Sequence, residues 1–278
     1  MGSMTNLIIG CGYLGRRVAS LWQGQGHRVI ALTRGRADDL RRDGLEPLLG
    51  DVLGSLTVLP VVDTVLYAVG MDRLSGRSFR EVYVDGLRNV LDNLPCPRRF
   101  IYVSSTSVYG QVNGEEIDES SPTEPLEENG RVILEAENLL RSRLPEAIIL
   151  RFAGIYGPGR ILRRAAIEQG EPLRGDADKW LNLIHVQDGA RAVEAANERG
   201  RPGETYLVAD GNPVRRRDFY TYMANLLKAP TARFEPLPSG APIPNHERSN
   251  RRILNRKMRE ELGVVLEFGD YRRGLSGI

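Results

Sequence analysis

Short apolar runs recur along the first half of the chain. They are NLIIG (6–10), HRVIALT (27–33), PLLGDV (47–52), TVLYAVG (64–70), RFIYVSS (99–105) and EAIILRF (146–152). Runs of this length without strict polar alternation are typical of parallel strands that are buried on both faces. The pattern therefore predicts a series of buried parallel strands.

Helical periodicity fills the intervals between these runs. Leu14, Val18, Leu21 and Trp22 share one face of a helix, and longer helical patterns cover residues 76–94 and 130–143. Strands that alternate with helices predict an α/β fold built on a doubly wound parallel sheet.

Composition narrows the classes of function. The chain has 278 residues with 38 Lys and Arg against 36 Asp and Glu, so its net charge of +2 does not favour nucleic acid as a partner. Cys11 and Cys96 are too few and too far apart for a disulfide framework or a metal site. No apolar run approaches the roughly 20 residues of a membrane span. We expect a cytoplasmic protein that binds neither nucleic acid nor a membrane.

The first apolar run ends in GCGYLG (10–15), which places Gly10, Gly12 and Gly15 in the spacing G-x-G-x-x-G. The motif follows a strand and begins a helix, which is the context that dinucleotide binding requires. Gly10 allows the tight turn, Gly12 allows a pyrophosphate to approach the backbone, and Gly15 allows close packing of helix on strand. We expect Tyr13 and Leu14, at the helix start, to contact the cofactor as well.

The end of the second strand indicates which dinucleotide binds. An NAD site usually places an acid there, whereas this chain has Thr33 and Arg34, with Arg36 close behind. A guanidinium can hold a 2′-phosphate through two charge-assisted hydrogen bonds. The sequence therefore favours NADP over NAD; the alternative is that Arg34 is an exposed arginine at a loop start.

The alternation of apolar strands and amphipathic helices ends after residue 153. GIYGPGR (154–160) and PTARFEPLPSGAPIPN (230–245) are rich in turn residues, and RSNRRILNRKMREELG (248–263) predicts a late helix. We expect residues 4–152 to form an NADP-binding Rossmann domain, to which later segments return. Residues 153–278 are expected to form mainly a smaller substrate-binding part that does not fold independently.

The motifs occur in an order that resembles the extended short-chain dehydrogenase/reductase superfamily, the NAD-dependent epimerase/dehydratase group. GDV (50–52), YAVG (67–70) and SSTSVYG (104–110) are similar to its adenine-contacting segment, its loop beside the adenosine and its active-site strand end. LRFAGIYGPGR (150–160) and NLIHVQD (182–188) are similar to its later motifs. The resemblance implies a homodimer and further cofactor contacts at Asp51, Val52, Ala68, Val69 and Ser104.

The chain departs from this family at the proton-transfer pair. When NGRVILEAE (129–137) is aligned with the family pattern, the tyrosine of YxxxK falls on Asn129 and the lysine on Ile133. An amide cannot act as a general acid or base near neutral pH, and isoleucine supplies no charge. The family's catalytic serine falls on Ser105; the alternative is a strand-end serine that bonds the backbone. The chain thus resembles an atypical subgroup that lacks the catalytic pair.

Other side chains could take over the proton transfer. Tyr83, which stands where the family has asparagine, and Tyr109, Tyr156 and His185 are candidates by their place in the motifs. We expect Tyr109 and His185 to be structural, and Tyr156 to belong to a turn with Arg160.

Four charged residues later in the chain have simpler interpretations. Glu135 and Glu137 are predicted on a solvated helix face. Arg251 and Arg252 are predicted at an exposed helix start, with binding of a phosphate-bearing substrate as the alternative.

Two functions remain open at this point. The first is an NADP-dependent oxidoreductase or epimerase-like enzyme with a non-standard proton path, acting on a small molecule such as a nucleotide sugar, a carbonyl compound or an imine. The second is a catalytically inactive NADP(H)-binding sensor or interaction protein. The retained cofactor motifs favour the first, and the loss at Asn129 and Ile133 motivates the second.

Overall fold

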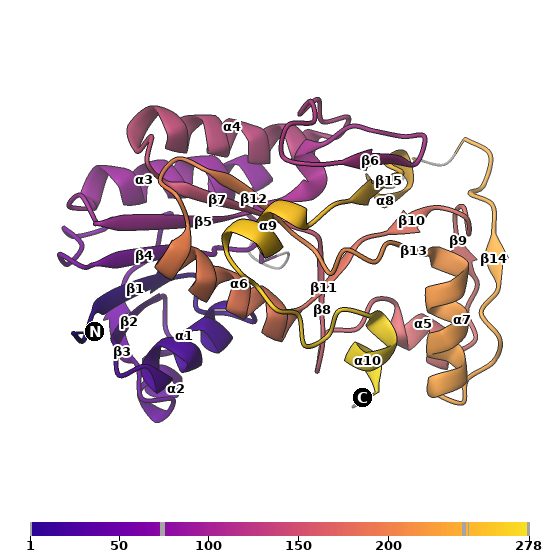
Figure 1. The fold of residues 1–278 in the computed structure, drawn as a ribbon, viewed down its shortest axis with the longest axis horizontal. Coiled ribbons are helices and arrows are strands. Elements are labelled where there is room, and N and C mark those ends of the chain that lie inside the picture. Colours follow the sequence, from indigo (N-terminus) through magenta and orange to yellow (C-terminus); the bar gives the residue numbers. More distant parts are fainter. Residues whose placement is uncertain (1, 73–75, 241–242, 244, 277–278) are drawn as a thin grey trace.

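The computed structural model describes residues 2–72, 76–240, 243 and 245–276. Within these residues the central sheet has seven parallel strands in the order β12-β7-β5-β4-β1-β2-β3 (Figure 1). Each of the six predicted runs overlaps a strand, and the pattern of apolar runs missed β12. The strands are β1 (Thr5–Ile9), β2 (Arg28–Thr33), β3 (Glu46–Leu49), β4 (Thr64–Tyr67), β5 (Arg99–Ser105), β7 (Ile148–Phe152) and β12 (Thr205–Val208).

Helices cover both faces of the sheet (Figure 1). The alternation along β1 explains this arrangement: Ile8 packs in the layer of α1, whereas Leu7 and Ile9 pack in the layer of α3 and α4, and all three side chains are fully buried. The first face carries α1 (Gly15–Gly24), α2 (Ala37–Arg42) and α6 (Val186–Arg199). The second carries the π-helical segment η1 (Glu81–Asp85), α3 (Gly86–Asn93) and α4 (Glu128–Arg143). None of the helices in the described residues is long and apolar enough to cross a membrane.

The later part of the chain contributes to the sheet and also builds a smaller lobe beyond its carboxyl end (Figure 1). This lobe has its own buried cluster around Tyr156, Phe219 and Tyr271. Its short strands pair as β8 (Gly154–Tyr156) with β11 (Leu183–His185), β9 (Leu173–Arg174) with β14 (Phe234–Glu235), and β10 (Trp180–Leu181) with β13 (Val214–Arg215). Its helices are α5 (Arg164–Glu168), α7 (Arg216–Leu226) and α10 (Tyr271–Leu275).

The prediction of a single helix over residues 248–263 is wrong. The structure has α8 (Asn245–Arg248), then the strand β15 (Arg251–Ile253), then α9 (Arg256–Glu261). β15 pairs in parallel with β6 (Glu115–Ile117), a segment far away in the sequence. The pairing places Ile253 in a buried cluster. Of the loop predicted over 230–245, residues 241–242 and 244 lie outside the described residues.

Candidate cofactor and active site

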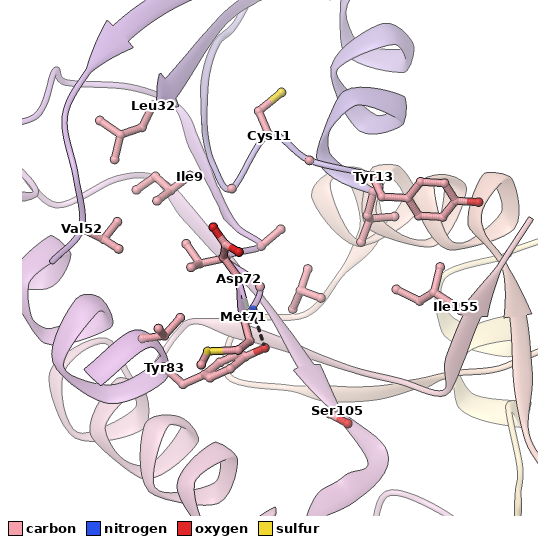
Figure 2. A pocket seen from close by; sticks show the side chains of 18 of the residues that line it. Ile9, Cys11, Tyr13, Leu32, Val52, Met71, Asp72, Tyr83, Ser105 and Ile155 are labelled. Atoms are coloured by element: carbon pink, nitrogen blue, oxygen red, sulfur yellow. Dashed lines mark hydrogen bonds between the residues drawn. The ribbon is translucent and has the colours of Figure 1, made fainter. Parts of the chain in front are cut away.

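A cavity of about 1120 Å³ lies at the carboxyl ends of the central strands. In the sheet order, β1 has β2 on one side and β4 on the other, so the chain reverses direction across the sheet at β1. In open α/β sheets, ligands bind at such a switch point. All the predicted cofactor residues except Gly15 line the cavity, and Figure 2 shows several of its side chains.

The three glycines of the loop have different structural requirements. Gly10 has φ +99°, and a Cβ there would lie 2.4 Å from the carbonyl carbon of Ala68. A Cβ on Gly15 would lie 2.6 Å from the carbonyl oxygen of Gly10. A Cβ on Gly12 would meet no protein atom within 4 Å, and Gly12 lines the cavity. Gly10 and Gly15 are therefore needed for packing, whereas Gly12 keeps space open for a ligand.

The start of α1 offers free backbone donors to that space. Among the described residues, the N–H groups of Tyr13 and Leu14 have no hydrogen-bond acceptor. The Tyr13 hydroxyl donates to the carbonyl of Pro158 at 3.0 Å, which ties the glycine loop to the turn at 157–160. Unpaired N–H groups at a helix N-terminus favour an anion, so this cradle fits a pyrophosphate.

The end of β2 presents arginines to the cavity. Arg34, Gly35 and Arg36 line it, and the hydroxyl of Thr33 accepts the N–H of Arg36 at 3.1 Å, which fixes the turn. Arg34 forms an exposed ion pair with Asp72 at 3.4 Å. An exposed pair of this length is weak, so it leaves the guanidinium able to bind a phosphate instead.

The other predicted cofactor positions lie around the same space. Val52, Ala68 and Val69 line the cavity, and the Asp51 carboxylate accepts the N–H of Leu53 at 3.0 Å within its own loop. Ser104 also lines the cavity, but its hydroxyl donates to Glu137 at 2.5 Å. The Ser104 side chain is therefore engaged by the protein itself.

The prediction that Glu137 lies on a solvated helix face is wrong. Its side chain is fully buried and accepts two hydrogen bonds from Arg151, at 2.9 and 2.6 Å, besides the bond from Ser104. Arg151 also donates to the Tyr109 hydroxyl at 2.7 Å. Glu135 is partly exposed and pairs with Arg80, as a surface residue does. The buried network fixes the end of β5 against α4 and β7, behind the cavity.

The structure separates Asn129 and Ile133, the two residues that we expect at the positions of the catalytic pair. Ile133 is 3% exposed and lines the cavity, so it contributes an apolar wall. Asn129 lies in the first turn of α4 and is not among the lining residues. Ser105 lines the cavity, and its hydroxyl oxygen accepts the N–H of Ser107 at 3.1 Å. This bond matches the alternative interpretation of Ser105, a strand-end serine that bonds the backbone. It uses only the oxygen, so the hydroxyl proton is still available to a ligand.

Tyr83 is the candidate proton donor that the structure places in the cavity. It lies in η1, and π-helical turns within helices are frequent at functional sites. Its hydroxyl oxygen accepts the N–H of Met71 at 3.2 Å, as Figure 2 shows, so its own proton can be donated to a ligand. Burial raises the pKa of Tyr83, although the Met71 bond and the charge of Arg160 oppose the shift. The phenol is therefore protonated at neutral pH and has a proton to donate, although its raised pKa makes it a weaker acid than an unperturbed tyrosine.

The other candidates do not line the cavity. Tyr156 is fully buried in the smaller lobe, and Tyr109 belongs to the Arg151 network. His185 precedes α6, and its Nδ1 accepts the N–H of Gln187 at 3.3 Å. Burial lowers the pKa of His185, which favours this neutral structural role.

Sequence reasoning missed Arg160 as a cavity residue. Gly157 and Arg160 exchange backbone hydrogen bonds, so the predicted turn is present, and it brings the Arg160 side chain to the cavity. The guanidinium lies 5.6 Å from the centre of the Tyr13 ring. No cluster of three or more His, Cys, Asp or Glu that could hold a metal occurs in the part of the chain that the structure describes.

Comparison with known proteins agrees with this architecture. Residues 7–209 match the NAD dependent epimerase/dehydratase family. Protein YeeZ of Escherichia coli K12 is 30% identical over 232 residues, covering 79% of this chain and 82% of YeeZ. A functionally unknown conserved protein from Silicibacter pomeroyi superposes with a TM-score of 0.81 at 30% identity, over 99% of this chain and 98% of that one.

A more distant structure shares the fold. The dTDP-glucose 4,6-dehydratase of Bacillus anthracis, solved in complex with NAD, superposes with a TM-score of 0.77 at 16% identity, over 99% of this chain and 95% of that one. Together with the glycine loop and the sheet order, the matches define the class: the chain belongs to the NAD-dependent epimerase/dehydratase family, within the extended short-chain dehydrogenase/reductase superfamily.

Proposed function

We propose that the protein is an NADP(H)-dependent oxidoreductase of the atypical kind, which acts on a small molecule by a proton path that does not use the family's pair. The observation that carries the proposal is the cavity itself. Space is open beside Gly12, and the N–H groups of Tyr13 and Leu14 are unpaired among the described residues. Val52 and Val69 supply apolar walls. These residues fit a dinucleotide, and a distant relative in fold was solved with NAD.

The arginines at the end of β2 favour binding of NADP over binding of NAD. The carboxylates that line the cavity within the described residues are Asp51 and Asp72, and neither follows β2, where an NAD-binding acid would stand. A 2′-phosphate at that strand end would meet Arg34 and Arg36 instead.

Replacing Arg34 tests the choice of cofactor. Arg34→Ala is expected to weaken NADPH binding by about 10- to 100-fold, since charge-assisted hydrogen bonds contribute about 1.5–3 kcal/mol. NADH binding should change little. Arg28→Ala is the matched control, because Arg28 lies at the opposite end of β2 and pairs with Glu46 on the surface. Equal losses for both cofactors in Arg34→Ala would contradict the assignment.

The protein's own groups would handle the proton. When bound, the nicotinamide supplies or accepts the hydride. Ser105 would donate a hydrogen bond to the oxygen of a bound carbonyl, and Tyr83 would transfer its proton to that oxygen as the carbonyl is reduced. Water would then reprotonate Tyr83. Ile133 supplies an apolar wall that excludes water from one side of the reaction space.

A substrate panel with two variants tests this path. We expect NADPH oxidation with at least one carbonyl compound, imine or nucleotide sugar. For a carbonyl, Tyr83→Phe should lower kcat by about 10²- to 10⁴-fold with little change in KM, the range typical of general acid catalysis. For an iminium substrate, which needs no added proton, Tyr83→Phe should have little effect while Ser105→Ala still probes positioning. A carbonyl substrate turned over equally by wild type and Tyr83→Phe would remove Tyr83 from the mechanism.

The alternative function is an inactive NADP(H) sensor or interaction protein. Ile133 favours it, because an isoleucine cannot hold the nicotinamide ribose as the family's lysine does. If NADPH binds but none of the panel is ever turned over, the sensor is the better account. We further propose a cytoplasmic location and a homodimer, the first because Cys11 and Cys96 are unpaired and the second by family resemblance.

A further inference from the structure

Among the residues that the structure describes, three arginines are buried, and one of them differs from the other two. Arg151 and Arg216 are each 5% exposed and form ion pairs with the buried carboxylates Glu137 and Glu247. Arg251 is 8% exposed, and no carboxylate lies within ion-pair distance of it among the described residues. The exposed helix start predicted for Arg251 is therefore wrong: it lies on the buried strand β15.

Neighbouring groups hold Arg251 firmly. The Asn182 side chain donates to the carbonyl of Arg251 at 2.9 Å and accepts the N–H of Ile253 at 2.7 Å. In the guanidinium, Nη2 donates to the carbonyl of Thr106 at 2.7 Å, while Nη1 is buried and has no hydrogen-bond partner within the described part of the chain. Burial lowers the pKa of Arg251 to about 10, so the group is still charged at neutral pH.

A buried charge without a counterion, with one of its nitrogens unpaired, is costly, and natural structures satisfy such groups with protein, water or a bound ion. A guanidinium is also planar and matches two oxygens of one anion. We propose that Arg251 is an anion-binding residue that takes the carboxylate or phosphate oxygens of a ligand on Nη1. Since Nη1 is closed to bulk solvent, binding requires a local opening beside it.

Arg251 lies behind one wall of the cavity and does not line it. Thr106, which Nη2 contacts, directly follows Ser105, and Ser105 lines the cavity. One small acidic molecule could therefore present its anionic group to Arg251 and its reacting group to Ser105. That assignment of the anion to the substrate rests on the proposed function, whereas the anion site itself does not.

Thermal unfolding in different anions tests the site. We would compare sodium phosphate and sodium malonate with sodium chloride at equal ionic strength and pH 7.5, for wild type, Arg251→Met and Arg252→Met. Arg252 is the matched control because it is the next residue of β15, partly exposed, and pairs with Glu116. Wild type and Arg252→Met should show a saturable rise in Tm of several degrees at about a hundredfold excess over Kd. Arg251→Met should show a clearly smaller rise, because the contribution of the Arg251 site is lost.

The comparison separates this site from other anion sites. Phosphate bound at the glycine loop would remain in Arg251→Met, so only the difference from wild type counts. A response to phosphate alone or to malonate alone identifies which oxyanion the site takes. Arg251→Lys, which keeps the charge but not the planar fork, should bind about tenfold more weakly and serves if Arg251→Met does not fold. The proposal is overturned if wild type responds to neither anion beyond chloride, or if Arg251→Met responds as wild type does.

Discussion

Replacing Glu137 by glutamine is expected to lower the free energy of unfolding by about 3–5 kcal/mol, the usual cost of breaking a buried ion pair by removing one partner. The carboxylate is fully buried and accepts hydrogen bonds from Arg151 and Ser104. Glutamine keeps the shape but leaves the charge of Arg151 without a counterion inside the protein. Chemical denaturation should show a lower midpoint with an unchanged slope.

Glu135→Gln is the control for this change. Glu135 lies two residues earlier on α4 and pairs with Arg80 at 2.6 Å, but the side chains of both are about half exposed. Such a pair contributes at most about 1 kcal/mol. If both variants lose the same stability, the Glu137 network is not the structural support that its burial indicates.

The second large effect concerns cofactor binding rather than stability. Gly12→Val is expected to fold normally and to lose dinucleotide binding by more than about 100-fold. Its backbone does not require glycine, and an added Cβ meets no protein atom within 4 Å, so the new side chain occupies only the cavity. Filling the approach to the backbone N–H groups of Tyr13 and Leu14 removes the pyrophosphate site.

Gly10→Ala provides the contrast. Gly10 has a positive φ and its Cβ would collide with the backbone of Ala68, so this variant should be destabilised rather than merely unable to bind. Comparing Tm with dinucleotide affinity in both variants separates the two roles. A Gly12→Val protein that binds NADPH as wild type does would show that the ligand lies elsewhere.

The central part of the fold could be predicted because its signals are local. Buried parallel strands leave apolar runs, and the glycine loop has a fixed spacing, so both are visible in the sequence. Tyr83 is different. A π-helical segment inside a helix has no simple periodic signature, and only the structure shows that η1 places this side chain in the cavity.

Glu137 could have been predicted from the sequence. The apolar side of α4 includes Ile133, Ala136 and Leu140, and Glu137 falls in the same stripe at helical spacing. Arg151 likewise stands inside an apolar strand. A single acid in a buried helix stripe and a single arginine in a buried strand indicate a buried pair.

Arg251 could not have been placed in this way. The sequence around it has helical spacing, but residues 251–253 pair with β6, which lies more than a hundred residues earlier. A strand that is defined by a partner so distant leaves little local trace. The same pairing buries Arg251, which is why its missing counterion became visible only in the structure.

The most direct test of the account is parallel calorimetric titration of the wild-type protein with NADPH and NADH. We propose that the cofactor site is functional although Asn129 and Ile133 stand at the positions expected for the catalytic pair. We expect saturable one-site binding of both dinucleotides, with NADPH tighter by about 10- to 100-fold because Arg34 and Arg36 line the cavity. Binding of neither by a folded protein would contradict the claim.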